Sequence, residues 1–318
     1  MKQILAFTLA MLLCFCLFSG CEKQKEPGIN STDFTFKLND NGNGYALAAY
    51  CGTDVNVIIP NSYEGLPVTE IYTNAFYQNP TVKSITVPGT ITEITSYTFS
   101  GCVALEAVSF QDGVTTLGQS IFSGCVNLTE ISLPKTVSSI DPFTFMDCAA
   151  LVNINLNSDN PYYHVSGNCL IETASRTLVV SCSNGVIPTD GNVTRIGPYA
   201  FYNRNWLTSI ELPDSIVSIG DHAFVSCYNL KEVILGSNVT EIEGRPFDQC
   251  QQLETIYYKG TQDALSDLGG IKFCIGYQSV SSSDGSSTMK LVTPKIYCYS
   301  ETEQADCWRY VNGVPSPW

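Results

Sequence analysis

Fourteen cysteines and two histidines are the residues of this 318-residue chain that could bind a metal ion or act in catalysis. Zinc sites usually contain close pairs of cysteine or histidine ligands, and no two cysteines here are separated by two residues. His164 and His222 lie far apart in the sequence, and neither has an evident serine or cysteine partner. The sequence therefore predicts no metal site, no cofactor and no histidine-based catalytic centre.

Five of the cysteines recur at one position of a repeated 23-residue unit. A free cysteine in a protein core behaves as a small apolar residue, so this recurrence predicts a column of buried thiols. Asn79 and Arg204 interrupt the column in the first and fifth units. The members of the column are Cys102, Cys125, Cys148, Cys227 and Cys250.

Two further cysteine pairs are disulfide candidates, because exported proteins can form such bonds. A predicted β-hairpin within residues 169–182 would place Cys169 opposite Cys182 if its loop had four residues. A shift of the hairpin register by one residue would separate the two sulfur atoms. Cys298 and Cys307 are the second candidate pair. Free thiols remain the alternative for both pairs.

Carboxylate pairs are the other feature that could support catalysis, because glycoside cleavage generally needs two of them. In the second and fourth positions of the repeat, Glu70 and Glu93 alone stack on neighbouring coils, and nothing basic adjoins them. This pattern favours a solvated polar edge. No nucleotide-binding glycine loop, HExxH or GxSxG motif occurs either. We therefore expect that the protein is not an enzyme.

The repeated unit that positions these side chains occurs seven times. Its third position is aliphatic, its eighth is phenylalanine, its fourteenth is leucine or valine, and its seventeenth and nineteenth are apolar. Apolar columns at a fixed period predict stacked coils that cover one another. Positions 17 and 19 predict a parallel strand on one side of each coil, and positions 1–3 a second short strand. The units start at Thr69, Thr92, Thr115, Ser138, Thr194, Val217 and Thr240.

The phenylalanine–cysteine turns at residues 99–102 and 122–125, and the Ile-x-Leu-Pro endings at 131–134 and 210–213, resemble the BspA-type leucine-rich repeats of bacterial surface proteins. The resemblance implies a mainly β leucine-rich repeat solenoid, here with seven 23-residue coils, an inserted β-hairpin at a coil edge, and N- and C-terminal caps. It also implies adhesion or recognition, because proteins of this family bind host matrix proteins or other cells.

The chain divides into a targeting region and five structural segments. The targeting region is described below, and the repeats form two blocks separated by the insertion. The predicted segments are an N-terminal β-hairpin cap at 33–68, units 1–4 at 69–160, the β-hairpin insertion at 161–193, units 5–7 at 194–262 and a C-terminal cap at 263–318.

Residues 1–20 have the pattern of a lipoprotein signal peptide. A positive charge precedes a short apolar run that ends at Phe18, and the following Ser19-Gly20-Cys21 resembles a lipobox. This pattern predicts cleavage before Cys21, lipidation of its sulfur, and a polar tether at 21–32. Ordinary secretion with an unmodified Cys21 is the alternative. With a lipid anchor, the protein would belong to the cell envelope, at the outer membrane and exposed on the bacterial surface.

The overall composition limits the partners of the protein. Thirty acidic and sixteen basic residues give a net charge of -14, which disfavours nucleic-acid binding. A charged share of only 14% suits a β-rich extracellular protein better than a helical cytosolic enzyme. We therefore expect an extracellular protein ligand, with a carbohydrate-binding or carbohydrate-processing accessory role as the alternative.

The predicted ligand face is formed by positions 16 and 18 of the repeat, which must point outward because position 17 points inward. In the N-terminal coils these positions are mostly small and polar, whereas in the C-terminal coils they include acidic and apolar residues, as interaction surfaces often do. Trp206 and Arg204, next to the insertion, form a second candidate site, although Trp206 could instead pack under the hairpin. The residues of the first candidate are Glu211, Glu232, Ile234 and Tyr257.

The lipid anchor yields the first testable prediction. The change Cys21→Ala removes the sulfur that would carry the lipid, so it should abolish metabolic fatty-acid labelling and release the protein from membranes. Labelling with a radioactive or clickable fatty acid, followed by membrane fractionation, measures both effects. Unchanged membrane association of the variant would show that Cys21 is not the anchor.

Overall fold

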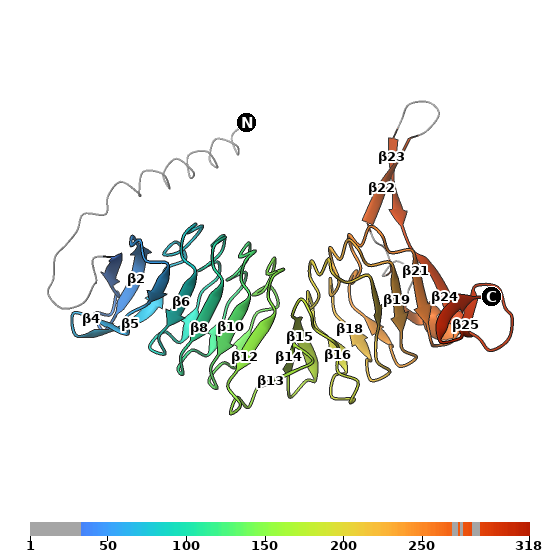
Figure 1. The fold of residues 1–318 in the computed structure, drawn as a ribbon, viewed down its shortest axis with the longest axis horizontal. Coiled ribbons are helices and arrows are strands. Elements are labelled where there is room, and N and C mark those ends of the chain that lie inside the picture. Colours follow the sequence, from blue (N-terminus) through green and yellow to red (C-terminus); the bar gives the residue numbers. More distant parts are fainter. Residues whose placement is uncertain (1–32, 269–272, 274–275, 282–286) are drawn as a thin grey trace.

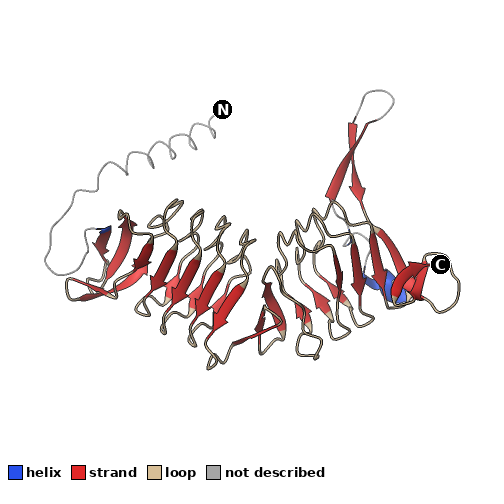
Figure 2. Cartoon of the chain, viewed as in Figure 1, coloured by secondary structure: helices blue, strands red, loops and turns tan. Residues whose placement is uncertain are grey.

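The computed structural model describes residues 33–268, 273, 276–281 and 287–318. The predicted signal peptide, Cys21 and the tether therefore lie outside the described residues. The described chain is an elongated stack of β-coils with the two caps at opposite ends (Figure 1), and strands and loops make up nearly all of it (Figure 2). No helix in these residues is long and apolar enough to cross a membrane.

A parallel sheet runs along one side of the stack, as the apolar positions 17 and 19 predict. In the first half its strand order is β12-β10-β8-β6-β3, and each strand after β3 covers positions 16–19 of its unit. Ile131 and Leu133 are buried, whereas the alternating Glu130 and Ser132 are partly exposed. The sheet extends beyond the predicted repeats because β3 pairs with β6 in the same parallel register. The bounds are β3 (Asn56–Ile58), β6 (Ser84–Val87), β8 (Ala107–Phe110), β10 (Glu130–Leu133) and β12 (Asn153–Leu156).

The second half continues the same pattern after the insertion. Its long strands pair in parallel in the order β17-β19-β21-β24, so a strand of the C-terminal cap prolongs the sheet. The predicted second short strand is also confirmed: it covers two residues in units 2–7, and in the first unit it is the end of the longer strand β5. The long strands are β17 (Ser209–Glu211), β19 (Glu232–Leu235) and β21 (Thr255–Tyr258); the short ones are β7 (Glu93–Ile94), β9 (Thr116–Leu117), β11 (Ser139–Ile140), β16 (Arg195–Ile196), β18 (Ser218–Ile219) and β20 (Glu241–Ile242).

A column of phenylalanine rings fills the core of each half. Phe122 is fully buried and stacks between Phe99 and Phe145, with ring centroids 5.8 and 6.0 Å away. Tyr50 of the N-terminal cap stacks on Phe76 at 5.5 Å and so ends the column with another aromatic ring. Each ring is covered in part by the rings of the neighbouring coils, which is why the coils need one another.

The cysteine column is confirmed, and its thiols do more than fill space. The Cys102 thiol donates a hydrogen bond to the carbonyl oxygen of Phe76 in the preceding coil at 3.0 Å, and Cys125 does the same to Phe99 at 3.1 Å. Burial raises the pKa of the Cys102 thiol to about 12, so the group stays protonated and able to donate. The equivalent bonds are Cys148 to Phe122, Cys227 to Phe201 and Cys250 to Phe224.

The insertion is an antiparallel meander that separates the two half-cores. Its strands are β13 (Tyr163–Ser166), β14 (Cys169–Glu172) and β15 (Thr177–Ser181), and β15 then pairs in parallel with β16. Alternate side chains enter different cores: Leu170 and Val180 join the first cluster, whereas Ile171 and Leu178 join the second. The predicted hairpin is confirmed, since β14 pairs antiparallel with β15. It does not lie at a coil edge, because both faces of β14 and β15 are buried between the two half-cores.

Both disulfide candidates are free thiols in the structure. An irregularity between Leu170 and Ile171 shifts the hairpin register, so Cys169 lies opposite Ser181 and not Cys182. Cys169 then belongs to the second core cluster and Cys182 to the first. This is the one-residue shift that separates the pair. Cys298 and Cys307 do lie opposite each other on adjacent strands, yet they too are free and buried.

The caps close the ends of the stack. The predicted N-terminal hairpin is confirmed, with β1 (Phe34–Leu38) paired antiparallel to β2 (Tyr45–Tyr50), and β2 pairs in parallel with β5. In the C-terminal cap the ribbon of β22 and β23 projects from the body (Figure 1). The remaining elements are β4 (Ser62–Tyr63), β5 (Leu66–Ile71), α2 (Gln262–Leu268), β22 (Gly276–Ser281), β23 (Ser287–Val292), β24 (Lys295–Tyr299), β25 (Cys307–Val311) and β26 (Val314–Pro317).

The two core columns predict different mutational costs. The change Phe122→Ala should lower the free energy of unfolding by about 3–5 kcal/mol, because it opens a cavity between two stacked rings. The change Cys125→Ala should cost much less, since a thiol is small. Guanidinium denaturation of both variants measures the difference. A larger cost for Cys125→Ala would contradict this description of the core.

Candidate functional site

Arg204 is a structural residue and not a ligand contact. It occupies the cysteine position of the fifth unit and is only 2% exposed. Its Nε donates to the carbonyl oxygen of Ser181 at 2.9 Å, and its Nη1 donates to that of Cys148 at 3.1 Å. Burial lowers the pKa of its guanidinium. The prediction that Arg204 contacts a ligand was wrong, because its side chain ties the fifth coil to the insertion and to the fourth coil.

Trp206 behaves differently from its neighbour. Its side chain is 42% exposed, so it does not pack under the hairpin as one interpretation of the sequence suggested. The two half-stacks meet nearby through Phe143 and Tyr199, whose ring centroids are 4.4 Å apart. Trp206 therefore remains exposed at the surface of the junction and could contact a ligand there. Arg204, the other residue of this predicted site, does not share that surface.

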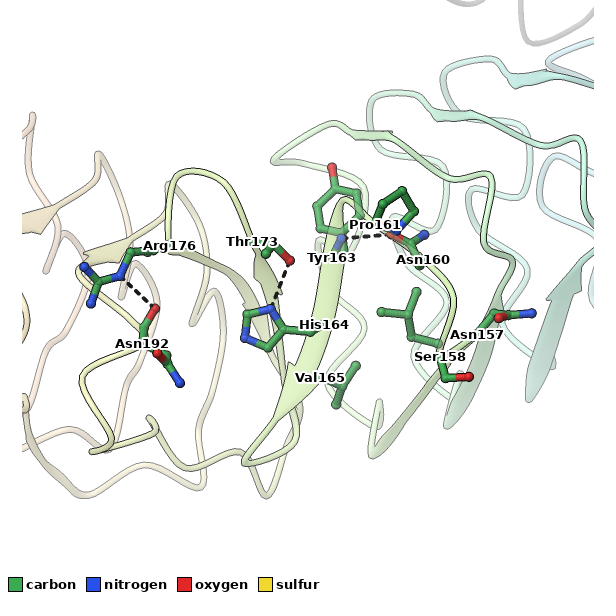
Figure 3. Close-up of a pocket in the computed structure, with 11 residues that line it drawn as sticks. Asn157, Ser158, Asn160, Pro161, Tyr163, His164, Val165, Thr173, Arg176 and Asn192 are labelled. Atoms are coloured by element: carbon green, nitrogen blue, oxygen red, sulfur yellow. Dashed lines mark hydrogen bonds between the residues drawn. The ribbon is translucent and has the colours of Figure 1, made fainter.

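A cleft of about 740 Å³ lies at the junction, between the end of β12 and the insertion. Figure 3 shows His164 of β13 and Thr173 pointing toward each other, with Arg176 and Asn192 on the far side. The His164 Nδ1 and Thr173 Oγ1 atoms are 3.1 Å apart, and the Arg176 Nε donates to the carbonyl oxygen of Asn192. These contacts hold the polar side chains in place.

The chemistry of this junction cleft is that of a polar recognition site. Its lining contains no carboxylate, so it cannot support the paired-carboxylate chemistry of glycoside cleavage. His164 has a threonine hydroxyl as its neighbour and no acid to orient it. Among the described residues, no group of three or more metal-ligating side chains gathers anywhere.

The predicted outward column of the C-terminal coils exists, but its aromatic residue is covered. Adjacent strands place Glu211 beside Ile234, Ile234 beside Tyr257, and Tyr257 beside Tyr297. The expected contact between the Ile234 and Tyr257 positions is thus confirmed. Tyr257, however, is only 4% exposed, because the Trp308 ring lies 5.1 Å from its centroid. Tyr257 is a packing residue, and its choice as a ligand contact was wrong.

The C-terminal cap presents other aromatic residues in its place. Trp308 is fully buried and its indole nitrogen donates to the carbonyl oxygen of Tyr258 at 3.1 Å. Tyr299 and Tyr310 pack against it at 5.3 and 4.9 Å and remain exposed. Sequence reasoning missed these residues, although tyrosines and a tryptophan at every second position of β24 and β25 were a signal. We call Ile234, Tyr297, Tyr299, Tyr310, Glu211 and Glu232 the C-terminal aromatic patch.

The two acidic residues of this patch differ in their contacts. The Glu211 carboxylate accepts hydrogen bonds from the Lys259 Nζ at 2.7 Å and from the Tyr310 hydroxyl at 3.3 Å. This link joins β17 to the far end of the cap. Glu232 is also exposed, on the neighbouring strand. The patch therefore combines exposed tyrosine rings with negative charge on a rigid base.

Comparisons with known proteins agree with this architecture. The family model described as the BspA type leucine rich repeat region matches residues 69–190 and 179–273, with six copies. These ranges span more than half of the chain, and the protein belongs to this family. No curated protein sequence matches the chain.

Several solved structures are similar to this chain at low sequence identity. A leucine-rich repeat protein from Eubacterium ventriosum is 18% identical, with 74% of this chain and 75% of that chain covered and a TM-score of 0.50. One from Bacteroides ovatus is 20% identical, with 74% and 72% covered and a TM-score of 0.42. A leucine rich cell surface protein from Faecalibacterium prausnitzii is 20% identical, with 78% and 98% covered and a TM-score of 0.35.

The family membership supports a general function. Leucine-rich repeat proteins of this family are in general protein-binding or adhesion modules and are typically not enzymes. The finer questions are the anchor, the partner and the contact surface.

The position of Arg204 gives a testable prediction. The change Arg204→Met should lower the free energy of unfolding by about 2–4 kcal/mol, because it leaves two buried carbonyl oxygens without donors. The matched control is Arg195→Met, whose exposed side chain forms ion pairs at 3.5 and 3.6 Å and should contribute no more than about 1 kcal/mol. Chemical denaturation compares the two, and equal costs would contradict the bridging role.

Proposed function

We propose that this protein is a lipid-anchored recognition module of the bacterial surface that binds an extracellular protein through its C-terminal aromatic patch. The partner would be a host matrix protein or a protein on another cell. The observation that carries the proposal is the exposed pair Tyr299 and Tyr310, held on the buried Trp308. Tyrosine rings on a rigid base are typical contact residues, since little side-chain entropy is lost on binding.

The charge of the patch suits a basic partner. Glu232 is exposed beside the tyrosines, Glu211 is exposed but paired with Lys259, and the chain carries a net charge of -14. Acidic groups at the rim of an interface mainly increase the association rate and make binding sensitive to salt. Binding through this patch should therefore weaken as the ionic strength rises.

The arrangement of the two ends also supports this assignment. The N-terminal and C-terminal caps lie at opposite ends of the long axis (Figure 1). A lipid on Cys21 would hold the chain next to the N-terminal cap, because the predicted tether at 21–32 leads directly to it. The C-terminal aromatic patch would then face away from the membrane, where a partner on another surface can reach it.

Paired variants test the contact surface. The full-length protein is first screened against purified matrix proteins by surface plasmon resonance. For a partner found in this way, the double change Ile234→Ser and Tyr310→Ser should weaken binding at least about tenfold, equivalent to roughly 1.4 kcal/mol. Thermal stability should change little, because both side chains are at least partly exposed.

The control for this test lies on the same sheet in the first half. Ser84→Ala with Thr86→Ala changes the outward positions of β6, which are small and polar, and should leave the affinity unaltered. Equal affinity of the patch variant and the parent would exclude the C-terminal aromatic patch. The contact surface would then have to lie elsewhere, with the junction cleft and Trp206 as the next residues to change.

A further inference from the structure

A second groove lies at the opposite end of the molecule from the C-terminal aromatic patch. It has a volume of about 1320 Å³ and is formed where the N-terminal cap meets the first two repeat units. Strands β2, β5 and β7 and the turns that follow them contribute its walls. The groove includes Glu70 and Glu93, which occupy the same repeat position on neighbouring coils. Neither residue takes part in the proposed protein-binding surface.

The groove coincides with an opening in the ladder of short strands. Between β7 and β9, the Thr116 amide donates to the Thr92 carbonyl oxygen and the Gly118 amide to that of Ile94. In this part of the described chain, β5 and β7 belong to different sheets, and the Thr95 hydroxyl donates a hydrogen bond to the Ile71 carbonyl oxygen of β5 at 3.4 Å. Glu93 and Thr95 are both exposed, so their polar groups are accessible to a ligand in the groove.

Two exposed tyrosine rings border this opening. Lys37 places its Nζ over the Tyr72 ring, 5.9 Å from the centroid, and the Gln78 amide donates to the Tyr77 hydroxyl at 3.3 Å. Both tyrosines line the groove and are exposed. These contacts hold the rings in position before a ligand arrives, which reduces the entropy lost on binding.

The rest of the lining is rich in neutral polar groups and contains no basic residue. The hydroxyls of several threonines and the amide groups of two asparagines can each donate and accept hydrogen bonds. The two glutamates can only accept when ionised. An anionic ligand would find two carboxylates in the lining and a single positive charge, that of Lys37 over the Tyr72 ring, beside it. A neutral polyol, by contrast, can donate to the carboxylates while its apolar faces stack on the rings.

From this combination we infer that the groove binds a neutral oligosaccharide. The sugar rings lie on Tyr72 and Tyr77, and hydroxyl groups donate to the carboxylates of Glu70 and Glu93. This site is independent of the C-terminal aromatic patch and of the proposed protein partner. The carbohydrate would be one on the cell's own surface, because the N-terminal cap is the end next to the predicted anchor.

The experiment uses the full-length protein in a detergent without a sugar headgroup. A neutral-glycan array is followed by isothermal titration calorimetry with the hexasaccharides that bind, drawn from gluco-, xylo- and manno-configured chains. Tyr72→Ala and Tyr77→Ala should each weaken binding about tenfold, a change equivalent to the loss of one stacking contact. Glu70→Gln, an exposed change that keeps the shape of the side chain, should weaken it less but measurably.

Two controls make the outcome decisive. Tyr97→Ala removes an equally exposed tyrosine of the next coil that does not line the groove, and should leave sugar binding unchanged. The patch variant Ile234→Ser with Tyr310→Ser should also bind sugar normally, which separates this proposal from the protein-binding function. Absence of glycan binding, or equal losses in Tyr97→Ala and Tyr77→Ala, would overturn the inference. Salt-sensitive binding of a decalysine peptide in place of sugars would assign the groove to a basic peptide instead.

Discussion

No coil of this solenoid can bury its own apolar face, and the rest of the structure depends on this constraint. The stacked phenylalanine rings show it directly, because Phe122 is covered by the rings of the coils above and below. The thiol of each core cysteine adds a polar tie, since it donates to the carbonyl oxygen of a phenylalanine one coil earlier. Stability is therefore built from contacts between nearest neighbours, as in other repeat proteins. Every end or interruption of the stack needs a replacement for the missing neighbour.

The structure meets this need in three different ways. At the N-terminal end, Tyr50 of the cap continues the ring column. At the C-terminal end, β24 prolongs the sheet and Trp308 covers Tyr257. In the middle, the insertion places apolar side chains on both faces of β14 and β15, and so supplies each half-core with a wall. Arg204 completes this joint, because a long side chain with several donors can reach two carbonyl oxygens that a cysteine could not.

Sequence reasoning was right about the elements that the 23-residue period specifies and less successful with contacts made by segments outside the repeats. The coils, the two strands per coil and the cysteine column follow from residue types that recur every 23 residues. The insertion has no such period, and a strand buried on both faces looks like a simple apolar run, so its role as a wall was not predictable. Tyr257 occupies an outward position by every local rule, yet Trp308, fifty-one residues later, covers it. Arg204 was named as a ligand contact because it lies next to the insertion, yet it occupies the inward cysteine position and is buried.

The division between inward and outward positions explains how one such fold can carry separate binding surfaces. The inward columns contribute nearly all of the coil-to-coil packing, so outward residues can change without loss of the fold. The C-terminal aromatic patch and the N-terminal groove both arise where a cap meets the repeats, at Tyr310 and at Tyr72. At these places the regular ladder changes or opens, and side chains from two different segments meet. In this protein the caps that cover the end coils therefore also form the two surfaces on which aromatic and charged side chains gather. The regular coils in the middle of each half act mainly as a spacer between these surfaces.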